Sequence, residues 1–241
     1  MSRILIAVAA LLACTACLAA GCTGAPPKPV RSCGLVVDAT SFSRNTDVPQ
    51  KLKAAVPKFL GGCDRVAFGV ISGAIGASDC RHEPMGLVAG PEDNAQDNPT
   101  RAGQINLQRK VSAVKTMNDL LACALGEKAT RNGSDVIGAL IGTARQAGAL
   151  DGSAKLLVIS DMAHRTKELN LYTAEIGSPA ERLAIISGLQ QANRLPQLSG
   201  VHVTIIGFGI GVTPEAVRQQ QIRDFWDLLF QKSGALPVTY L

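Results

Sequence analysis

The stretch Gly34–Thr40, GLVVDAT, decides the fold, because an apolar run there ends abruptly in oxygen-bearing side chains. Leu156–Asp161, LLVISD, repeats that form far along the chain. Short continuous apolar runs of this kind are typical of parallel strands buried on both faces, which share one carboxyl-end edge where loops build sites. A third segment, Asn132–Asp135 (NGSD), opens a predicted helix. The three segments predict one parallel sheet with a polar site at its carboxyl edge.

Four oxygen-bearing residues form the candidate site at that edge. They are Asp38, Thr40, Ser134 and Asp161. Carboxylate and hydroxyl oxygens are the ligands of hard divalent cations, so this set predicts a site for Mg2+, with Mn2+ or Ca2+ as alternatives. Taken singly, Asp38 also suits a strand end and Ser134 a helix cap, which is the alternative without a metal.

Strand and helix patterns alternate along the rest of the chain. Predicted strands are Gly34–Asp38, Arg65–Ser72, Lys155–Ser160 and Val201–Phe208, with short edge strands near Gly86–Ala89 and Pro237–Leu241. Predicted helices are Asp47–Leu60, Gln104–Leu125, Ser134–Ala149, Pro179–Arg194 and Pro214–Lys232. In the first of these helices Pro49 must lie in the first turn, and Pro57 must kink or end it. This alternation predicts one α/β domain over residues 33–241, doubly wound, with a mostly parallel sheet and helices on both faces.

The first residues read as an export signal rather than as part of the fold. A basic start is followed by an apolar run from Ile4 to Ala20 and by small residues, which is the form of a signal peptide over residues 1–21. The ending Ala19-Ala20-Gly21-Cys22 resembles the bacterial lipoprotein signal, which implies that Cys22 is acylated and anchors the chain to a membrane. Cys14 is a rival position, and ordinary secretion is the alternative. Residues 22–32, rich in proline, predict an extended tether.

Cysteine usage agrees with export to the cell envelope. Four cysteines remain beyond Cys22, namely Cys33, Cys63, Cys80 and Cys123. An even number in an exported chain indicates two disulfides, for which three pairings exist. Cys33 and Cys63 each precede a strand-like run, so their pairing is favoured if those strands are parallel neighbours. Zinc is the rival interpretation, but no Cys-x-x-Cys pair lies outside the signal.

The charged residues do not indicate a nucleic-acid partner. The chain of 241 residues has a formal net charge of +5, and its Lys and Arg residues are scattered without basic runs or interleaved aromatics. No Gly-x-Ser-x-Gly elbow is present, so a serine hydrolase is not indicated.

Several motifs together resemble the von Willebrand factor type A (vWA) family. Asp38-Ala39-Thr40-Ser41-Phe42 is similar to the start of that family's Asp-x-Ser-x-Ser motif, and Ser134 precedes Ala139-Leu140 much as the family's Thr does. Ser160-Asp161-Met162 resembles the family's Thr-Asp-Gly. Two later segments, Ile205–Gly209 (IIGFG) and Phe225–Phe230 (FWDLLF), stand where the family has a strand end and its last helix. The resemblance covers about residues 34–234 and implies a Rossmann-like fold with a metal-ion-dependent adhesion site.

The resemblance also implies a function. Such a site binds a partner protein that offers a carboxylate to the open position of the cation, so we expect a binding module and not an enzyme. Phe42 stands where the family has its second Ser, which removes one hydroxyl ligand. The alternatives are a metal-free scaffold of an envelope assembly, or an exported hydrolase that uses Asp38, Asp161 and a metal, with His164 as its base.

Overall fold

The structure, a computed structural model, describes residues 30–73, 79–127, 133–148, 154–211 and 215–241, apart from the side chains of residues 44 and 45. The predicted signal peptide, Cys22 and most of the tether lie outside the described residues.

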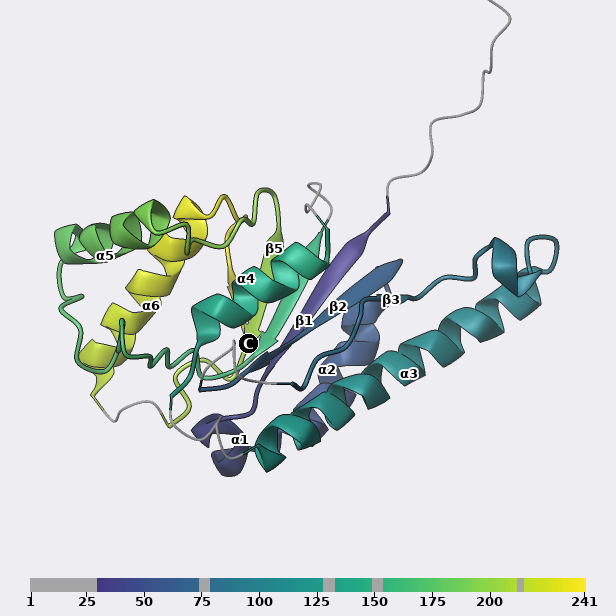
Figure 1. The fold of residues 1–241 in the computed structure, drawn as a ribbon, viewed down its shortest axis with the longest axis horizontal. Coiled ribbons are helices and arrows are strands. Elements are labelled where there is room, and N and C mark those ends of the chain that lie inside the picture. The colour runs from purple at the N-terminus through teal and green to yellow at the C-terminus, as the bar shows by residue number, and fades with distance from the viewer. Residues whose placement is uncertain (1–29, 74–78, 128–132, 149–153, 212–214) are drawn as a thin grey trace, which may run out of the picture.

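A six-stranded sheet forms the centre of the domain (Figure 1). Its strands are β1 (Ser32–Asp38), β2 (Arg65–Ile71), β3 (Met85–Gly86), β4 (Lys155–Ile159), β5 (His202–Ile206) and β6 (Thr239–Tyr240). They lie in the order β3-β2-β1-β4-β5-β6, which is the order of a doubly wound sheet. All neighbours pair in parallel except β2 and β3, which are antiparallel. The predicted α/β class with a mostly parallel sheet is therefore confirmed.

Helices cover both faces of the sheet (Figure 1). They are α1 (Ser41–Asn45), α2 (Val48–Leu60), α3 (Pro99–Gly126), α4 (Val136–Gln146), α5 (Pro179–Gln191) and α6 (Ala216–Lys232), with a short 3-10 helix at Pro91–Asp93. Side chains of β1 alternate between two cores: Val36 packs with α4, α5 and α6, whereas Leu35 and Val37 pack with α2 and α3. None of the helices among the described residues is long and apolar enough to cross a bilayer.

Some predicted boundaries were wrong for local reasons. α3 begins at Pro99, before the predicted start, because Asn98 caps it by accepting a hydrogen bond from Arg101 N. The predicted end of α2 at Leu60 is confirmed, with Pro57 inside the helix. The short helix α1 was not predicted at all. It carries Phe42 into the core between α2, α3 and the sheet, where the side chain is only 1% exposed.

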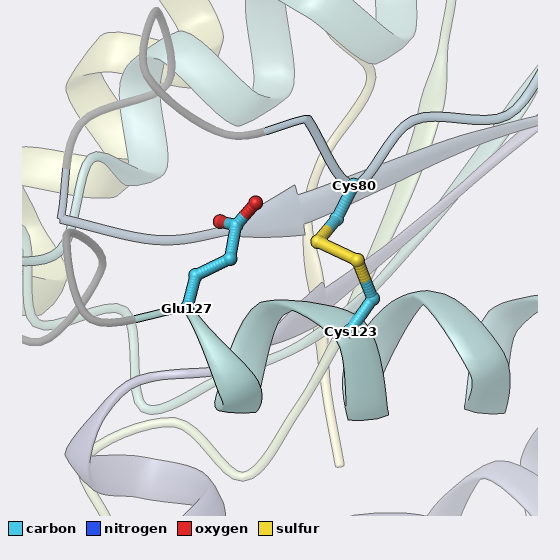
Figure 2. Close-up of side chains that lie close together, drawn as sticks. All are labelled: Cys80, Cys123 and Glu127. Atoms are coloured by element: carbon cyan, nitrogen blue, oxygen red, sulfur yellow. A yellow bond between two sulfur atoms is a disulfide. The ribbon is translucent and has the colours of Figure 1, made fainter.

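Two disulfides join the cysteines as Cys33–Cys63 and Cys80–Cys123. The first confirms the pairing favoured by the sequence, since β1 and β2 are indeed parallel neighbours whose starts lie side by side. The second fastens the segment after β2 to α3 (Figure 2). Bridges that close loops of this length each stabilise a fold by about 3–4 kcal/mol. Their presence indicates an oxidising compartment.

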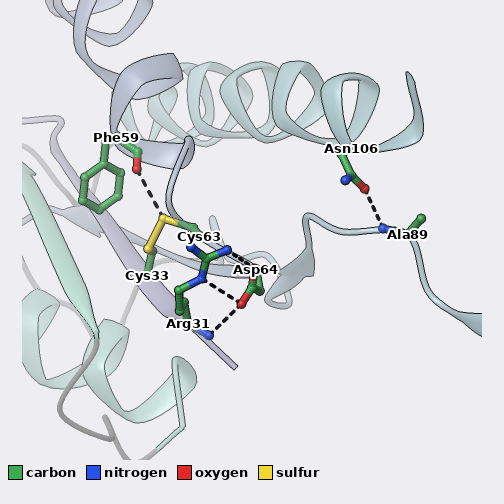
Figure 3. Close-up of polar contacts among 7 residues, drawn as sticks. All are labelled: Arg31, Cys33, Phe59, Cys63, Asp64, Ala89 and Asn106. Carbon is green, nitrogen blue, oxygen red and sulfur yellow. Dashed lines mark hydrogen bonds and ion pairs between the residues drawn. A yellow bond between two sulfur atoms is a disulfide. The ribbon is translucent and has the colours of Figure 1, made fainter. Parts of the chain in front are cut away.

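The ordered domain starts earlier than the predicted residue 33. The Arg31 guanidinium and backbone N–H both donate to the Asp64 carboxylate, and Asp64 N donates back to Arg31 O at 2.9 Å (Figure 3). β1 then begins at Ser32. Arg31 and Ser32 therefore belong to the domain rather than to the tether.

Two glycines let α4 approach the sheet closely. A Cβ added to Gly69 of β2 would lie 2.0 Å from Thr143 Oγ1, and one added to Gly34 of β1 would lie 2.9 Å from Thr143 Cγ2. Thr143 of α4 is almost fully buried over these two positions. The close approach positions α4, whose first residues border the candidate site.

We predict that Gly69→Ala destabilises the fold by about 1–3 kcal/mol through overpacking against Thr143. Adding Thr143→Ala removes the clashing hydroxyl, so the double variant should cost less than the sum of the two single variants. Urea unfolding of the three variants measures this coupling.

Gly142→Ala is the matched control, because its Cβ would meet nothing within 4 Å on the same helix. It should leave stability unchanged or raise it by up to about 1 kcal/mol. Simple additivity of Gly69→Ala and Thr143→Ala would contradict the proposed packing.

Candidate metal centre

The candidate site lies at the carboxyl edge of the sheet, where the strand order reverses between β1 and β4. Asp38 is the last residue of β1, and Ser160 and Asp161 directly follow β4. The register pairs Val37 with Ile159, which sets Asp38 beside Ser160. Doubly wound sheets commonly bind ligands at this position, outside the carboxyl ends of the strands at a topological switch point.

Asp38 is fully buried, and both of its carboxylate oxygens accept hydrogen bonds. Oδ1 accepts from Thr40 N at 2.8 Å and from the Thr40 hydroxyl at 2.6 Å, and Oδ2 accepts from the Ser160 hydroxyl at 2.7 Å. Burial raises the pKa of this carboxyl above its usual value, and the hydrogen bonds from Thr40 and Ser160 oppose that shift. The bonds bind the end of β1 to β4 across the switch point.

Asp161 places a second carboxylate beside the first. Its Oδ1 accepts from Ala163 N at 2.9 Å, and the residue is only 4% exposed. Burial raises the pKa of Asp161 to about 7, and the charge of Asp38 adds to the shift. A buried carboxyl whose charge is disfavoured by a neighbouring carboxylate marks a position at which a cation would be stabilised.

Ser134 supplies a buried hydroxyl without a partner. Its backbone forms an isolated bridge with Arg165, since Ser134 N donates to Arg165 O at 2.8 Å and Arg165 N donates to Ser134 O at 2.9 Å. Its Oγ is buried and has no hydrogen-bond partner. The helix-cap alternative for Ser134 is wrong, because Asp135 caps α4 by accepting from Gly138 N. A buried hydroxyl that is left unpaired costs about 1–3 kcal/mol, which a ligand would recover.

Phe42 is buried in the core beside the carboxyl end of β5. Its ring lies against Gly207, where an added Cβ would approach ring atoms to 2.7 and 2.9 Å. Gly207 has a φ of +94° and follows β5 directly. The neighbouring Ser43 hydroxyl donates to Thr40 O at 2.9 Å and so stabilises the loop between β1 and α1. No described hydroxyl of α1 replaces the one that Phe42 lacks.

The ring of His164 lies against the start of α4. It is buried, and its Nδ1 lies 3.5 Å from Ile137 N and 3.9 Å from Asp135 Oδ1, at the start of α4. Burial lowers the pKa of the imidazole to about 4, with Arg194 adding to the shift. The neutral ring therefore packs against the start of α4, the helix that Ser134 precedes by two residues. His202, in contrast, is exposed at the start of β5.

Sequence reasoning missed two residues of the site. Ser160 was seen only as part of a motif, yet its hydroxyl donates to Asp38 and accepts from Met162 N at 2.9 Å. Tyr172 is half-buried. Burial raises the pKa of its phenol, and the charge of Asp161 adds to that shift. The sequence signal for Ser160 is its place directly before Asp161. Tyr172 lies on a long loop without a sequence pattern that would indicate its role.

Met162 holds the loop after Asp161 in an unusual conformation. Its φ is +64°, its side chain is fully buried, and its carbonyl accepts from the Trp226 indole N–H at 2.9 Å. The left-handed region disfavours residues that carry a Cβ. The tryptophan bond and the Ser160 bond together hold Met162 there and thereby direct Asp161.

The described donors fit a hard divalent cation. Two carboxylates and the hydroxyls of Thr40 and Ser134 are an all-oxygen set, and Thr40 Oγ1 keeps lone pairs after donating to Asp38. The paired negative charges and the orphaned Ser134 hydroxyl both favour such an ion.

A second group of ligand-type residues does not form a metal site. Cys80, Cys123 and Glu127 place one donor atom each within 4.8 Å of one another. Figure 2 shows that the two sulfurs are joined in a disulfide, so they offer no thiolates. Glu127 Oε1 instead accepts from Asp79 N at 3.0 Å.

Comparison with known proteins yields a weak likeness in structure and none in sequence families. No family model and no curated protein matches the chain. Among solved structures, the chain is similar to the pilus adhesin SpaC from Lactobacillus rhamnosus GG in its open conformation, with 13% sequence identity and a TM-score of 0.39. The match covers 89% of this chain and 28% of the adhesin, so the chain spans less than a third of that protein's length.

We predict that Met162→Gly is more stable than Met162→Ala by about 1 kcal/mol, the reverse of the usual order. Both variants lose the buried side chain, but only glycine relieves the positive φ. Urea midpoints of the two variants test this. Lys53→Ala and Lys53→Gly, at an exposed position inside α2, should show the ordinary order with glycine about 1 kcal/mol worse. A less stable glycine variant at residue 162 would contradict the assigned strain.

Proposed function

We propose that this chain is an extracytoplasmic protein-binding module of the vWA type that holds Mg2+ at its carboxyl edge. One observation carries the proposal: two buried carboxylates, Asp38 at the end of β1 and Asp161 just after β4, lie at the same sheet edge, where burial and the charge of Asp38 raise the pKa of Asp161, and the buried Ser134 hydroxyl has no partner. A binding site for a hard cation accounts for all three features together.

The vWA likeness supports this reading through the order of its elements. Asp38 and Thr40 follow the central strand, Ser134 precedes a helix beside it, and Asp161 follows the next strand of the switch point. Besides exchanges of Ser and Thr, two positions depart from that family. Met162 stands where it has glycine, and Phe42 where it has a serine.

The residues of such a site would have different roles in binding the ion. Thr40 and Ser134 hold the ion through hydroxyl oxygens, and Asp161 supplies a carboxylate with one oxygen engaged by Ala163 N. Asp38 fixes Thr40 and Ser160 through its hydrogen bonds and balances the positive charge. The ion would supply an electrophilic position for a carboxylate of a partner protein, and Phe42 leaves the residues present one hydroxyl short of the family's set.

The cysteines and the first residues support an extracytoplasmic compartment. Two disulfides support export to an oxidising space. The signal-like start and Cys22 support a lipid anchor on the membrane of a bacterial envelope.

A metal-free scaffold is the second candidate, and a specific observation favours it. Asp38 already accepts three hydrogen bonds, so its charge is partly stabilised without an ion. The hydrolase alternative has no comparable support, because His164 lies against the start of α4.

We predict that Mg2+ at a hundredfold excess over its Kd stabilises the wild-type chain by about 2.7 kcal/mol relative to chelator. Asp161→Asn should be more stable than wild type in chelator, since it removes a buried charge that Asp38 repels. It should gain nothing from Mg2+. Thermal unfolding with Mg2+ and with chelator measures both effects.

Asp97→Asn is the control, because Asp97 is an exposed acid remote from the sheet edge, between the 3-10 helix and α3. It should retain the full increment from Mg2+. Identical melting of the wild-type chain with Mg2+ and with chelator would reject the metal and leave the scaffold reading.

A further inference from the structure

We propose that the end of the domain opposite the metal centre, here called the amino pole, is a contact surface for a lipid bilayer that contains anionic lipids. The amino pole comprises Val30 and Arg31, the turn at Asp64, residues 87–93 and the first half of α3. This inference rests on the lipid anchor in the proposed function and adds a second, non-covalent membrane contact.

The amino pole is one continuous surface built around the point where the chain enters the domain. Arg31 is fastened to Asp64, and Leu87 N donates to Asp64 O at 2.8 Å. Ala89 N then donates to Asn106 Oδ1 of α3 at 2.6 Å (Figure 3). Arg109 of the same helix binds Val88 O and Asp93. These contacts hold the first half of α3 beyond the amino end of β2, as Figure 1 also shows.

Large apolar side chains are exposed on this surface. They are Val30, Val88, Leu107 and Val111. Leu107 and Val111 lie one helical turn apart on α3 with exposed fractions of 66% and 62%. At 100° per residue they share one stripe, and Lys110 and Lys115 fall on its two sides. Apolar residues flanked by lysines are typical of helices that rest in a membrane interface.

The charge of the amino pole complements anionic headgroups. Exposed or half-exposed cations around it are Lys58, Arg101, Lys110 and Lys155. Its acidic residues are mostly engaged, since Asp64 pairs with Arg31 and both Asp93 and Glu92 pair with Arg109. Each basic residue near an anionic surface contributes about 1 kcal/mol to membrane attraction.

The tether brings the bilayer within reach of this surface. Val30 lies eight residues after Cys22, and a proline-rich chain extends by about 3.1 Å per residue, so a tether of this length would keep the domain within about 25 Å of the acylated cysteine. The seven residues of β1 then carry the chain about 23 Å to Asp38. A bilayer that contacts the amino pole therefore leaves the carboxyl edge open to a partner protein.

The test uses the full acylated chain in vesicles, with a fluorophore on Val111→Cys or, as matched control, on Val217→Cys. Val217 is 72% exposed at the start of α6, beyond the carboxyl end of β5. In vesicles of phosphatidylcholine with 30% phosphatidylglycerol, brominated lipid should quench the label at 111 several-fold more than the label at 217. The difference should shrink in pure phosphatidylcholine and when Leu107→Gln is added.

Equal quenching at the two sites, with the protein still floating with the vesicles, would overturn this inference and leave the anchor intact. Failure of the unlabelled wild-type chain to float with vesicles would overturn both the anchor and this inference. Neither outcome touches the metal centre, which the Mg2+ melting experiment tests by itself.

Discussion

The structure depends on the burial of Asp38 between two strands that reverse the order of the sheet. Its carboxylate is bound by Thr40 on its own loop and by Ser160 of the next strand, so a single side chain joins β1 to β4 where the chain crosses over. Burying a charge there is costly unless hydrogen bonds or a counter-ion compensate it. Asp161 increases that cost, because burial and the charge of Asp38 raise its pKa to about 7.

The packing of the surrounding elements positions the other polar groups near these two carboxylates in the fold. Gly69 and Gly34 let Thr143 bring α4 onto the sheet, which sets Ser134 at the edge with its hydroxyl unpaired. Trp226 of α6 holds Met162 in a left-handed conformation directly after Asp161. Polar groups that are buried and incompletely satisfied concentrate at functional sites, because a ligand completes them. Packing on both faces of the sheet thus positions these polar groups at its carboxyl edge.

Much of the fold could be predicted from the sequence, and the details of the site could not. Apolar runs such as Gly34–Asp38 and their alternation with helical patterns identify a doubly wound sheet, because burial on both faces leaves a strong periodic signal. The sequence also placed Asp38 and Asp161 at the same edge. It did not indicate that Phe42 would turn into the core on α1, or that Asp135 rather than Ser134 would cap α4. Those outcomes depend on tertiary packing, which one residue's neighbours in sequence do not encode.

Direct counting of bound metal tests the central claim that the two buried carboxylates and the two hydroxyls form a cation site. Titration of the metal-stripped full chain with Mn2+, followed by electron paramagnetic resonance of the free ion, should give one bound Mn2+ per chain. Mg2+ should displace it, and Asp38→Asn should abolish it. A wild-type chain that leaves all Mn2+ free, or an Asp38→Asn variant that binds as well as wild type, would contradict the account.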